Sequence, residues 1–483
     1  MQITKTNYME ERYIASIDLG TSKFGLCVAR VKGDDVQIVY YKETPADGIR
    51  NSLVLNPQKA SIPLKKAIEE AESELMIKIL QVVVGLPRYD VRQEIASGTV
   101  DRADPDEFIS AGEVSDLKSL ALETYPLEDS QSQIMYGAVA QSFSIEDQIE
   151  AMEDDVIGAI SGNIKGTFKV FIGNRKATVA VDKIFNTLGI AIAKKYFLPD
   201  VVAKAVLTED EKQNGVALVD IGAGVTSVSI YFGGIMRSYA AIPFGGLNIT
   251  KDIRSECTIS EELAENIKKR FGACLPSKLG PLSEKVLQLR VTDPIREVPV
   301  RYISEIIDAR SREILSAVLY YIQESGLHND LRSGIVLTGG GARLTNIGNL
   351  LKDMSGYEIR PGYPRHRFSA EVSSIYELGA TASVGMILAA KDDHLPDCAT
   401  TPETVVEEKK PELVYEEVFV DEATGNGQLF SPDEIVTVEK ETKKKKKGTK
   451  VTTKKISKET GEETTGTIFW DKLTSWYNKM TEE

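Results

Sequence analysis

Short apolar stretches alternate with amphipathic ones over the first 394 of the 483 residues. YIASIDLGTSKFGLCVARV predicts two strands joined by a tight turn that contains glycine. SIPLKKAIEEAESELMIKI predicts a helix over 61–79, opened by Ser61 with Pro63 in its first turn. QVVVGLP follows as a short buried strand. Strands and helices in alternation predict an α/β protein.

A second strand pair repeats the first about 200 residues later. In GVALVDIGAGVTSVSIYF, the segment VDIG at 219–222 matches IDLG at 17–20. Two lobes of similar design imply a cleft between them. The less regular segments 84–178 and 254–330 are predicted to be inserted subdomains. The chain is thereby divided into a first lobe core (1–83 and 179–214), an inserted subdomain (84–178), a second lobe core (215–253 and 331–394), a further subdomain (254–330), a linker (395–466) and a terminal helix (467–483).

The composition changes after residue 394. Residues 395–466 are rich in Thr, Glu, Lys, Pro and Gly, which predicts a disordered linker because such a segment buries little apolar area. The last segment, GTIFWDKLTSWYNKMTEE, has helical periodicity and carries both tryptophans of the chain on its apolar face. It predicts an amphipathic membrane-targeting helix whose membrane-binding residues are Ile468, Phe469, Trp470, Leu473, Trp476, Tyr477 and Met480. Docking of this helix onto the body or onto a partner is the alternative.

Charge is unevenly placed along the chain. The net charge is −14, which argues against nucleic acid as a partner. Residues 440–483 nevertheless carry 12 Lys against 7 Asp and Glu, so the tail favours an anionic membrane surface. A solvated linker or a nuclear signal is the alternative interpretation of the lysine run at 443–447. The four cysteines and three histidines form no metal-ligand spacing, and no secretory signal or membrane-spanning stretch is expected.

Three glycine-containing strand ends predict a site for a nucleoside triphosphate. Such a ligand needs backbone N–H groups, small side chains and a carboxylate near Mg²⁺. The first element offers Asp18, Gly20, Thr21, Ser22 and Lys23. The second offers Asp220, Gly222, Gly224 and Thr226, and the third offers Gly339, Gly340 and Gly341 for an adenine ring. A single Asp-x-Gly is more often a hairpin turn, but three in this order indicate a nucleotide.

These motifs resemble those of a known superfamily. IDLGTSK, VDIGAGVTS and IVLTGGGARL, in this order, are similar to the two phosphate motifs and the adenosine motif of the superfamily that contains actin, sugar kinases and heat-shock chaperone ATPases. Within it, GIRNSLVLNP, IPFGGLNITKDI and AENIKKRFG resemble segments of the FtsA family of actin-like bacterial cell-division proteins. The resemblance covers about residues 10–392 and the terminal helix. It implies an actin-like fold, with two ribonuclease-H-like lobes around a nucleotide cleft.

The resemblance also implies roles for individual residues. Asp18 and Asp220 would organise Mg²⁺ through water, and the glycine loops would cradle the phosphates of ATP. Gly245 and Gly246 would lie near the ribose and phosphates. Glu265 and Lys268 would contact ribose and adenine, although an i,i+3 surface salt bridge is the alternative.

Two departures from the family pattern concern hydrolysis. The second loop carries Ala223 and Val225 where Gly and Thr are usual. Leu198-Pro199 replaces the Glu-Pro in which glutamate orients the attacking water, with Asp200 as a possible substitute. The catalytic residues therefore remain unknown, and the sequence predicts an ATP-binding scaffold that is at most a slow ATPase.

The implied function is a polymerising protein that tethers FtsZ filaments to the cytoplasmic membrane at the division site. Its expected partners are the C-terminal tail of FtsZ, further copies of itself, an anionic membrane surface and other division proteins. Arg301 and Arg310 are candidate contacts for the acidic FtsZ tail. A pilus-assembly-type actin-like ATPase at the inner membrane, a superfamily kinase and a chaperone-type ATPase are the alternatives, and no sequence motif supports either of the last two.

Overall fold

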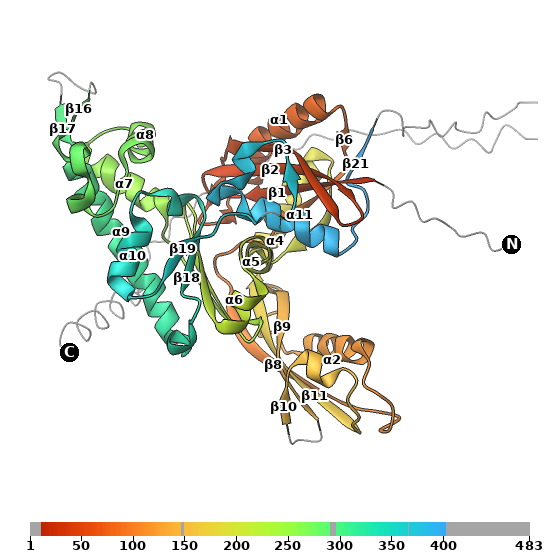
Figure 1. Ribbon diagram of the computed structural model, residues 1–483. Coiled ribbons are helices and arrows are strands. Elements are labelled where there is room, and N and C mark those ends of the chain that lie inside the picture. Colours follow the sequence, from red (N-terminus) through yellow and green to blue (C-terminus); the bar gives the residue numbers. More distant parts are fainter. Residues whose placement is uncertain (1–10, 146–148, 290–295, 366, 402–483) are drawn as a thin grey trace, which may run out of the picture. The chain divides into compact units, whose positions relative to one another are not determined.

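The computed structural model describes residues 11–145, 149–289, 296–365 and 367–401 (Figure 1). Its contacts divide the chain into a unit up to residue 405 and a second unit from 406, so every described residue belongs to the first unit. The helix predicted over 467–483 and the linker beyond residue 401 lie outside the described residues. Within the described part, no helix is long and apolar enough to cross a bilayer.

The first lobe is built on a six-stranded mixed sheet in the order β12-β7-β1-β2-β3-β20. β1, β2 and β3 form an antiparallel meander, and β7 lies parallel to β1 on its other side. Apolar residues such as Ile14, Ile17, Val83 and Val84 are fully buried, which is typical of a sheet covered on both faces. The strands are β1 (Arg12–Leu19), β2 (Lys23–Lys32), β3 (Asp35–Pro45), β7 (Gln81–Gly85), β12 (Ala191–Tyr196) and β20 (Ser369–Ala370).

Four helices cover this sheet in two pairs. α1 packs against α4, and α5 packs against α11. Their bounds are Pro57–Leu75 for α1, Arg175–Leu188 for α4, Leu198–Val206 for α5 and Thr381–Asp392 for α11. The predicted start of α1 at Ser61 was wrong by four residues. The side-chain oxygen of Asn56 caps the helix by accepting the N–H of Lys59 at 3.0 Å, and Pro57 occupies the first helical position.

The second lobe repeats the strand arrangement of the first. Its five-stranded sheet has the order β15-β14-β13-β18-β19. β13 pairs antiparallel with β14 and parallel with β18, as β1 does with β2 and β7. The strands are β13 (Val216–Ile221), β14 (Thr226–Phe232), β15 (Ile235–Ile242), β18 (Ile335–Thr338) and β19 (Ile359–Pro361). This repetition confirms the predicted fold class of two related α/β lobes.

The remaining elements of the second lobe are mostly helical. α7 packs against α8 and α9. The helices are α7 (Gly246–Cys257), α8 (Glu261–Phe271), α9 (Val300–Glu324) and α10 (Ile347–Ser355), and the strands β16 (Val286–Leu289) and β17 (Arg296–Pro299) form a hairpin. The short helix α6 (Glu209–Asn214) directly precedes β13.

A separate small sheet lies within the segment 84–178. Its strands have the order β10-β9-β11-β8, and α2 packs on β8 and β11 over a core that contains Leu117, Phe143 and Phe168. The capping box of Ser110 and Glu113 begins α2. The bounds are β8 (Arg92–Asp101), α2 (Ala111–Thr124), β9 (Gln133–Ile145), β10 (Ile149–Ala151), α3 (Glu153–Val156) and β11 (Asn163–Asn174).

The chain after residue 368 returns to the first lobe. β20 pairs with β3, α11 packs on β1, and β21 (Ala399–Thr400) pairs with β6 (Lys78–Ile79). The sequence had placed 331–394 in the second lobe and begun the linker at 395. The strand pairings therefore place 369–400 in the first lobe. The sequence pattern missed this because the segment after 394 is polar on average, although Cys398 and Ala399 are buried. The other boundaries remain a division proposed from the sequence.

Candidate functional site

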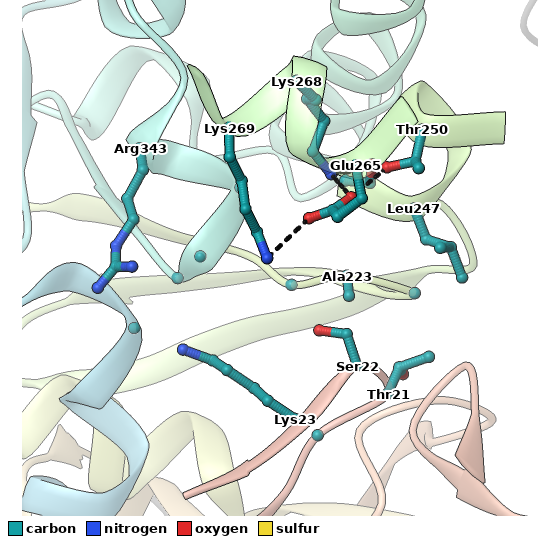
Figure 2. A pocket seen from close by; sticks show the side chains of 18 of the residues that line it. Thr21, Ser22, Lys23, Ala223, Leu247, Thr250, Glu265, Lys268, Lys269 and Arg343 are labelled. Atoms are coloured by element: carbon teal, nitrogen blue, oxygen red, sulfur yellow. Dashed lines mark hydrogen bonds and ion pairs between the residues drawn. The ribbon is translucent and has the colours of Figure 1, made fainter. Parts of the chain in front are cut away.

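A cavity of about 1540 Å³ lies between the hairpin turns of the two lobes. Its lining holds nine Lys and Arg side chains against six Asp and Glu, although the whole chain has a net charge of −14. Figure 2 shows Lys23, Lys269 and Arg343 reaching into it from three different elements. The lining therefore carries a net positive charge, which attracts an anionic ligand even though the chain as a whole is negative.

The β1–β2 turn forms one wall. A Cβ at Gly20 would lie 2.6 Å from the carbonyl oxygen of Lys23, so only glycine fits this turn without movement. The Lys23 ammonium forms an ion pair with Glu43, which also accepts the Tyr41 hydroxyl at 2.9 Å. The cation predicted to meet the phosphates is thus already held at the cavity by a carboxylate.

A short hairpin, β4–β5, contacts the β1–β2 turn. β4 (Ile49–Arg50) and β5 (Leu53–Val54) are joined by Asn51 and Ser52, both with positive φ (47° and 62°), as a two-residue hairpin turn requires. The turn directs the Ser52 N–H to Thr21 Oγ1 at 3.0 Å. The Thr21 side chain is therefore positioned by Ser52, a residue outside the motif IDLGTSK that contains Thr21.

The β13–β14 turn forms the facing wall. The Gly222 N–H donates to the Val225 carbonyl at 2.9 Å, and a Cβ at Gly222 would lie 2.7 Å from that oxygen. Gly224 approaches the first wall so closely that a Cβ would lie 2.9 Å from the Thr21 side chain. Ala223 and Val225, the two departures in this loop, both line the cavity.

The two predicted metal-organising carboxylates lie on either side of Arg88. Asp18 is near the end of β1 and Asp220 near the end of β13, while Arg88 follows β7. The guanidinium forms an ion pair with Asp220 and lies 4.0 Å from Asp18 Oδ1. Burial raises the pKa of Asp18, and the charge of Arg88 only partly offsets this effect.

This arrangement does not fit a magnesium ion that both carboxylates ligate directly, whereas the binding of Mg²⁺ through water stays a prediction. Mg²⁺ demands near-ideal octahedral oxygen ligands, whereas an oxygen of Asp220 already accepts from Arg88. Among the described residues, no three His, Cys, Asp or Glu side chains gather in a group that could hold a metal.

Glu265 and Lys268 line the opposite end of the cavity, on α8. Their side chains form an ion pair at 2.7 Å (Figure 2). Lys268 also donates to the Gly246 carbonyl and to Thr250 Oγ1, each at 2.8 Å, and Thr250 donates to Glu265 at 2.5 Å. The pair is therefore both a salt bridge and part of the cavity wall, so the two alternative interpretations do not exclude each other.

The glycine run after β18 lines the cavity next to the second acidic residue. Gly339 has φ +87°, and a Cβ there would overlap Asp220 Oδ1. A Cβ at Gly341 would overlap the Ile221 side chain, whereas one at Gly340 would meet open space. The backbone of Gly339 therefore lies against Asp220, while the position of Gly340 is open to a ligand.

Two predicted residues lie behind the wall rather than on it. The buried Thr226 hydroxyl donates to the Phe244 carbonyl at 2.9 Å, and a Cβ at Gly245 would lie 2.8 Å from the Ala223 carbonyl. Neither belongs to the cavity lining, so both shape the loop instead. The other fourteen predicted nucleotide-binding residues do line it: Asp18, Gly20, Thr21, Ser22, Lys23, Asp220, Gly222, Gly224, Gly246, Glu265, Lys268, Gly339, Gly340 and Gly341.

The sequence did not indicate several lining residues, namely Glu43, Asn51, Ser52, Arg88, Lys269 and Arg343. For Arg88 a signal existed. A charged residue placed shortly after a buried parallel strand lies at the edge where ligands bind in α/β sheets. The predicted strand QVVVGLP ends one residue before Arg88, and the sequence assigns Arg88 to the inserted segment 84–178 rather than to a site.

The helix expected to carry a water-orienting group is apolar at its start. Leu198 and Pro199 begin α5 and border a small void beside Arg88 and Asp220. Asp200 is exposed and is not among the described residues that line the large cavity. The element therefore offers no acidic or amide side chain to the cavity at this place.

Arg301 and Arg310 both lie on α9 but in different environments. They lie nine positions apart, so at about 100° per residue they point to opposite sides of the helix. Arg310 makes two hydrogen bonds to Asp252 on α7, at 2.5 and 3.0 Å. Arg301 is 66% exposed and pairs with Glu305 one turn away at 3.2 Å.

Two lobes built on one repeated strand arrangement, with a cavity between their hairpin turns, define an actin-like protein. In agreement, a chain of the solved PilM-PilN type IV pilus biogenesis complex superimposes over 78% of this chain and 98% of its own, with a TM-score of 0.56 at 15% identity. The family model "Cell division protein FtsA" matches residues 217–384.

Relatives that cover most of the chain narrow the class further. Cell division protein FtsA of Neisseria meningitidis serogroup B is 31% identical over 366 residues, covering 74% of this chain and 85% of that protein. The Escherichia coli protein of the same name is 24% identical, covering 80% and 92%. The chain belongs to the FtsA family of cell division proteins.

Proposed function

We propose that this FtsA-family protein binds ATP between its lobes, polymerises, and tethers FtsZ filaments to the cytoplasmic face of the membrane at the division site. The observation that carries the nucleotide proposal is the meeting of two glycine turns, one from each lobe, over a cationic cavity. Backbone N–H groups in tight turns and nearby cations are what a polyphosphate requires.

The cavity has separate regions for the two ends of ATP. The turns at Gly20 and Gly222 and the Lys23 side chain suit the phosphates. The α8 pair and the glycine run at 339–341 suit the adenosine. At about 1540 Å³ the cavity exceeds the 300–1,000 Å³ or so of common ligand pockets, so its size does not exclude a nucleotide. The apolar start of α5 favours binding over rapid hydrolysis.

The membrane proposal rests on residues 467–483, which lie outside the described structure. Its support is the sequence: an apolar face with both tryptophans, preceded by ten lysines in 440–458. One such helix binds reversibly, so stable attachment would come from many copies along an ATP-dependent filament.

Tryptophan emission provides a direct test, because Trp470 and Trp476 are the only tryptophans in the chain. We expect vesicles rich in anionic lipid to shift the emission of the full chain to shorter wavelength, and added salt to weaken this effect. In co-sedimentation, ATP should increase pelleting of the full chain, and a 1–466 truncation should stay in the supernatant. Equal pelleting of the two chains would reject the anchor.

The two candidate arginines differ in how readily they could bind the FtsZ tail. An exposed i,i+4 pair such as Arg301–Glu305 contributes only about 0.3–0.5 kcal/mol, so its arginine can readily exchange partners. Arg310 is committed to a two-point contact with Asp252.

We therefore expect Arg301→Glu to weaken binding of an FtsZ C-terminal tail peptide at least about tenfold in an anisotropy titration. The melting temperature and the ATP affinity of Arg301→Glu should equal those of the wild type. Lys352→Glu, which reverses another exposed, paired cation outside 254–330, is the control and should bind like the wild type. Equal binding by Arg301→Glu would remove this contact from the proposal.

A further inference from the structure

We propose that Arg88 is a built-in cation of the cleft, which takes the place of Mg²⁺ between Asp18 and Asp220 and allows ATP to bind without a divalent metal. This inference rests on the proposed ATP binding and concerns how the site compensates charge. It follows from the misfit between the two carboxylates and a metal ion described above.

The backbone of Arg88 is fixed by contacts from both lobes. Its N–H donates to Ser52 Oγ at 3.1 Å, in the first lobe. Its carbonyl accepts the hydroxyl of Tyr239, on β15 of the second lobe, at 2.6 Å. A residue held on both sides presents its side chain in one direction, so the guanidinium does not depend on a mobile loop for its position.

The side chain is enclosed together with the two acids. Exposed fractions are 13% for Arg88, 16% for Asp18 and 7% for Asp220. Two carboxylates that face the same guanidinium in a poorly solvated place repel each other and would repel a polyphosphate. A guanidinium stays charged at any physiological pH, so it neutralises part of this charge permanently.

The guanidinium also retains capacity for a ligand. It carries five N–H donors, and its hydrogen bond to Asp220 uses one of them. Arg88 lines the same cavity as the two glycine turns, so remaining donors are within the region assigned to the phosphates. Arginine matches phosphate oxygens in geometry as well as in charge.

The contact also joins the lobes. Asp18 lies on β1 of the first lobe, Arg88 follows β7 of the same sheet, and Asp220 lies on β13 of the second lobe. The ion pair of Arg88 with Asp220 therefore links a residue that follows the first lobe's sheet to a strand of the second lobe.

The test is the magnesium dependence of ATP affinity, measured by calorimetry on the full chain in excess Mg²⁺ and in EDTA. For the wild type we expect the two dissociation constants to agree within about threefold. Arg88→Gln removes the charge, and its affinity in EDTA should fall at least about tenfold below its affinity in Mg²⁺. Arg88→Lys keeps the charge and should give an intermediate ratio.

Arg343→Gln is the matched control. Arg343 lines the same cavity but pairs with Glu377, so its loss should weaken ATP in both conditions equally and leave the ratio unchanged. A wild-type ratio above about tenfold overturns the inference, and this measurement needs no variant to fold. The same ratio in wild type and Arg88→Gln overturns it as well. Absence of ATP binding in Mg²⁺ as well as in EDTA would instead overturn the proposed function, and this inference with it.

Discussion

Replacing Gly339 with alanine is expected to lower the free energy of unfolding by about 3–5 kcal/mol and to abolish ATP binding. At φ +87° and ψ 167° the residue occupies a region that only glycine adopts without strain. The added Cβ would also overlap Asp220 Oδ1 and lie 2.5 Å from the Ile221 carbonyl. Both neighbours belong to β13, so relief requires the floor of the cleft to move.

Gly340→Ala is the matched control one residue away. Its φ is not in the left-handed region, and a Cβ there meets no atom within 4 Å. We expect the variant without ligand to be as stable as the wild type or up to about 1 kcal/mol more stable, because alanine restricts the unfolded chain. Its ATP affinity should fall nevertheless, since the methyl group extends into the cavity region assigned to adenosine.

Thermal unfolding with and without ATP separates these two effects. The wild type should gain stability with ATP as RT ln(1 + [L]/Kd), which is about 2.7 kcal/mol at a hundredfold excess over Kd. Gly339→Ala should melt earlier and show no gain, and Gly340→Ala should melt normally and show a reduced gain. A Gly339→Ala protein with wild-type stability would show that the loop tolerates the strain.

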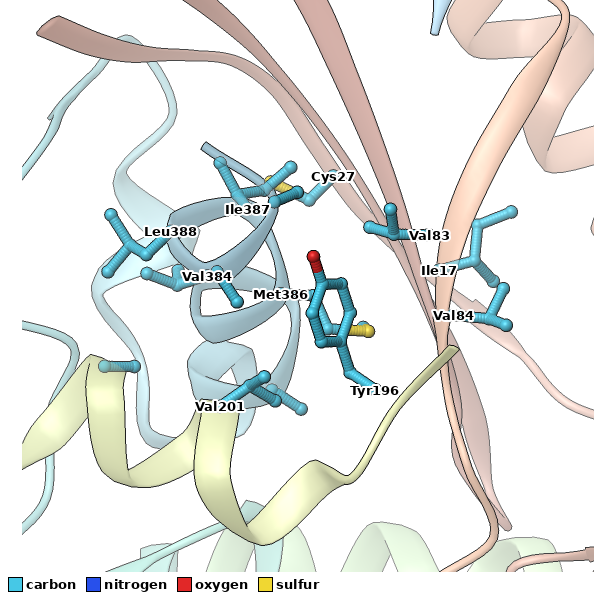
Figure 3. Close-up of a cluster of buried hydrophobic side chains, with 14 of the residues drawn as sticks. Ile17, Cys27, Val83, Val84, Tyr196, Val201, Val384, Met386, Ile387 and Leu388 are labelled. Carbon is cyan, nitrogen blue, oxygen red and sulfur yellow. The ribbon is translucent and has the colours of Figure 1, made fainter. Parts of the chain in front are cut away.

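Gly385→Ala is expected to destabilise the first lobe by about 3 kcal/mol or more. Gly385 lies in the middle of α11, where a Cβ would overlap the Val201 carbonyl oxygen and lie 2.5 Å from its carbon. These are backbone atoms of α5, so no rotamer change can relieve the clash. Figure 3 shows Val384, Met386 and Ile387 of α11 within the same cluster as Val201.

Gly348→Ala tests whether any helical glycine would behave in this way. Gly348 lies in the first turn of α10, and its nearest atom to an added Cβ is Ile359 Cγ2 at an ordinary 3.6 Å. We expect no loss, and a gain of up to about 1 kcal/mol from helix propensity. Far-UV circular dichroism is the suitable probe, because both tryptophans lie in 467–483 and do not report on this core. Equal melting of the two variants would contradict close packing of α11 on α5.

The sequence by itself determined the repeated strand pairs and the positions of their turns. Alternation of apolar residues and the recurrence of Asp-x-Gly depend on neighbours in the chain, so they are readable without a structure. The same holds for the glycine run at 339–341. Its order after the two turns carried the family resemblance, which the relatives confirm.

Tertiary structure decided what these elements contact. α11 is buried almost throughout, but only the fold shows that it lies on the first lobe against α5. Thr226 follows a glycine turn in sequence, yet its hydroxyl points to Phe244 and away from the cavity. Arg88 lies 70 residues from Asp18 and 132 from Asp220, and only the folded chain brings the three together. Local pattern fixes which face of an element is buried, whereas the partner on that face is set by packing between distant segments.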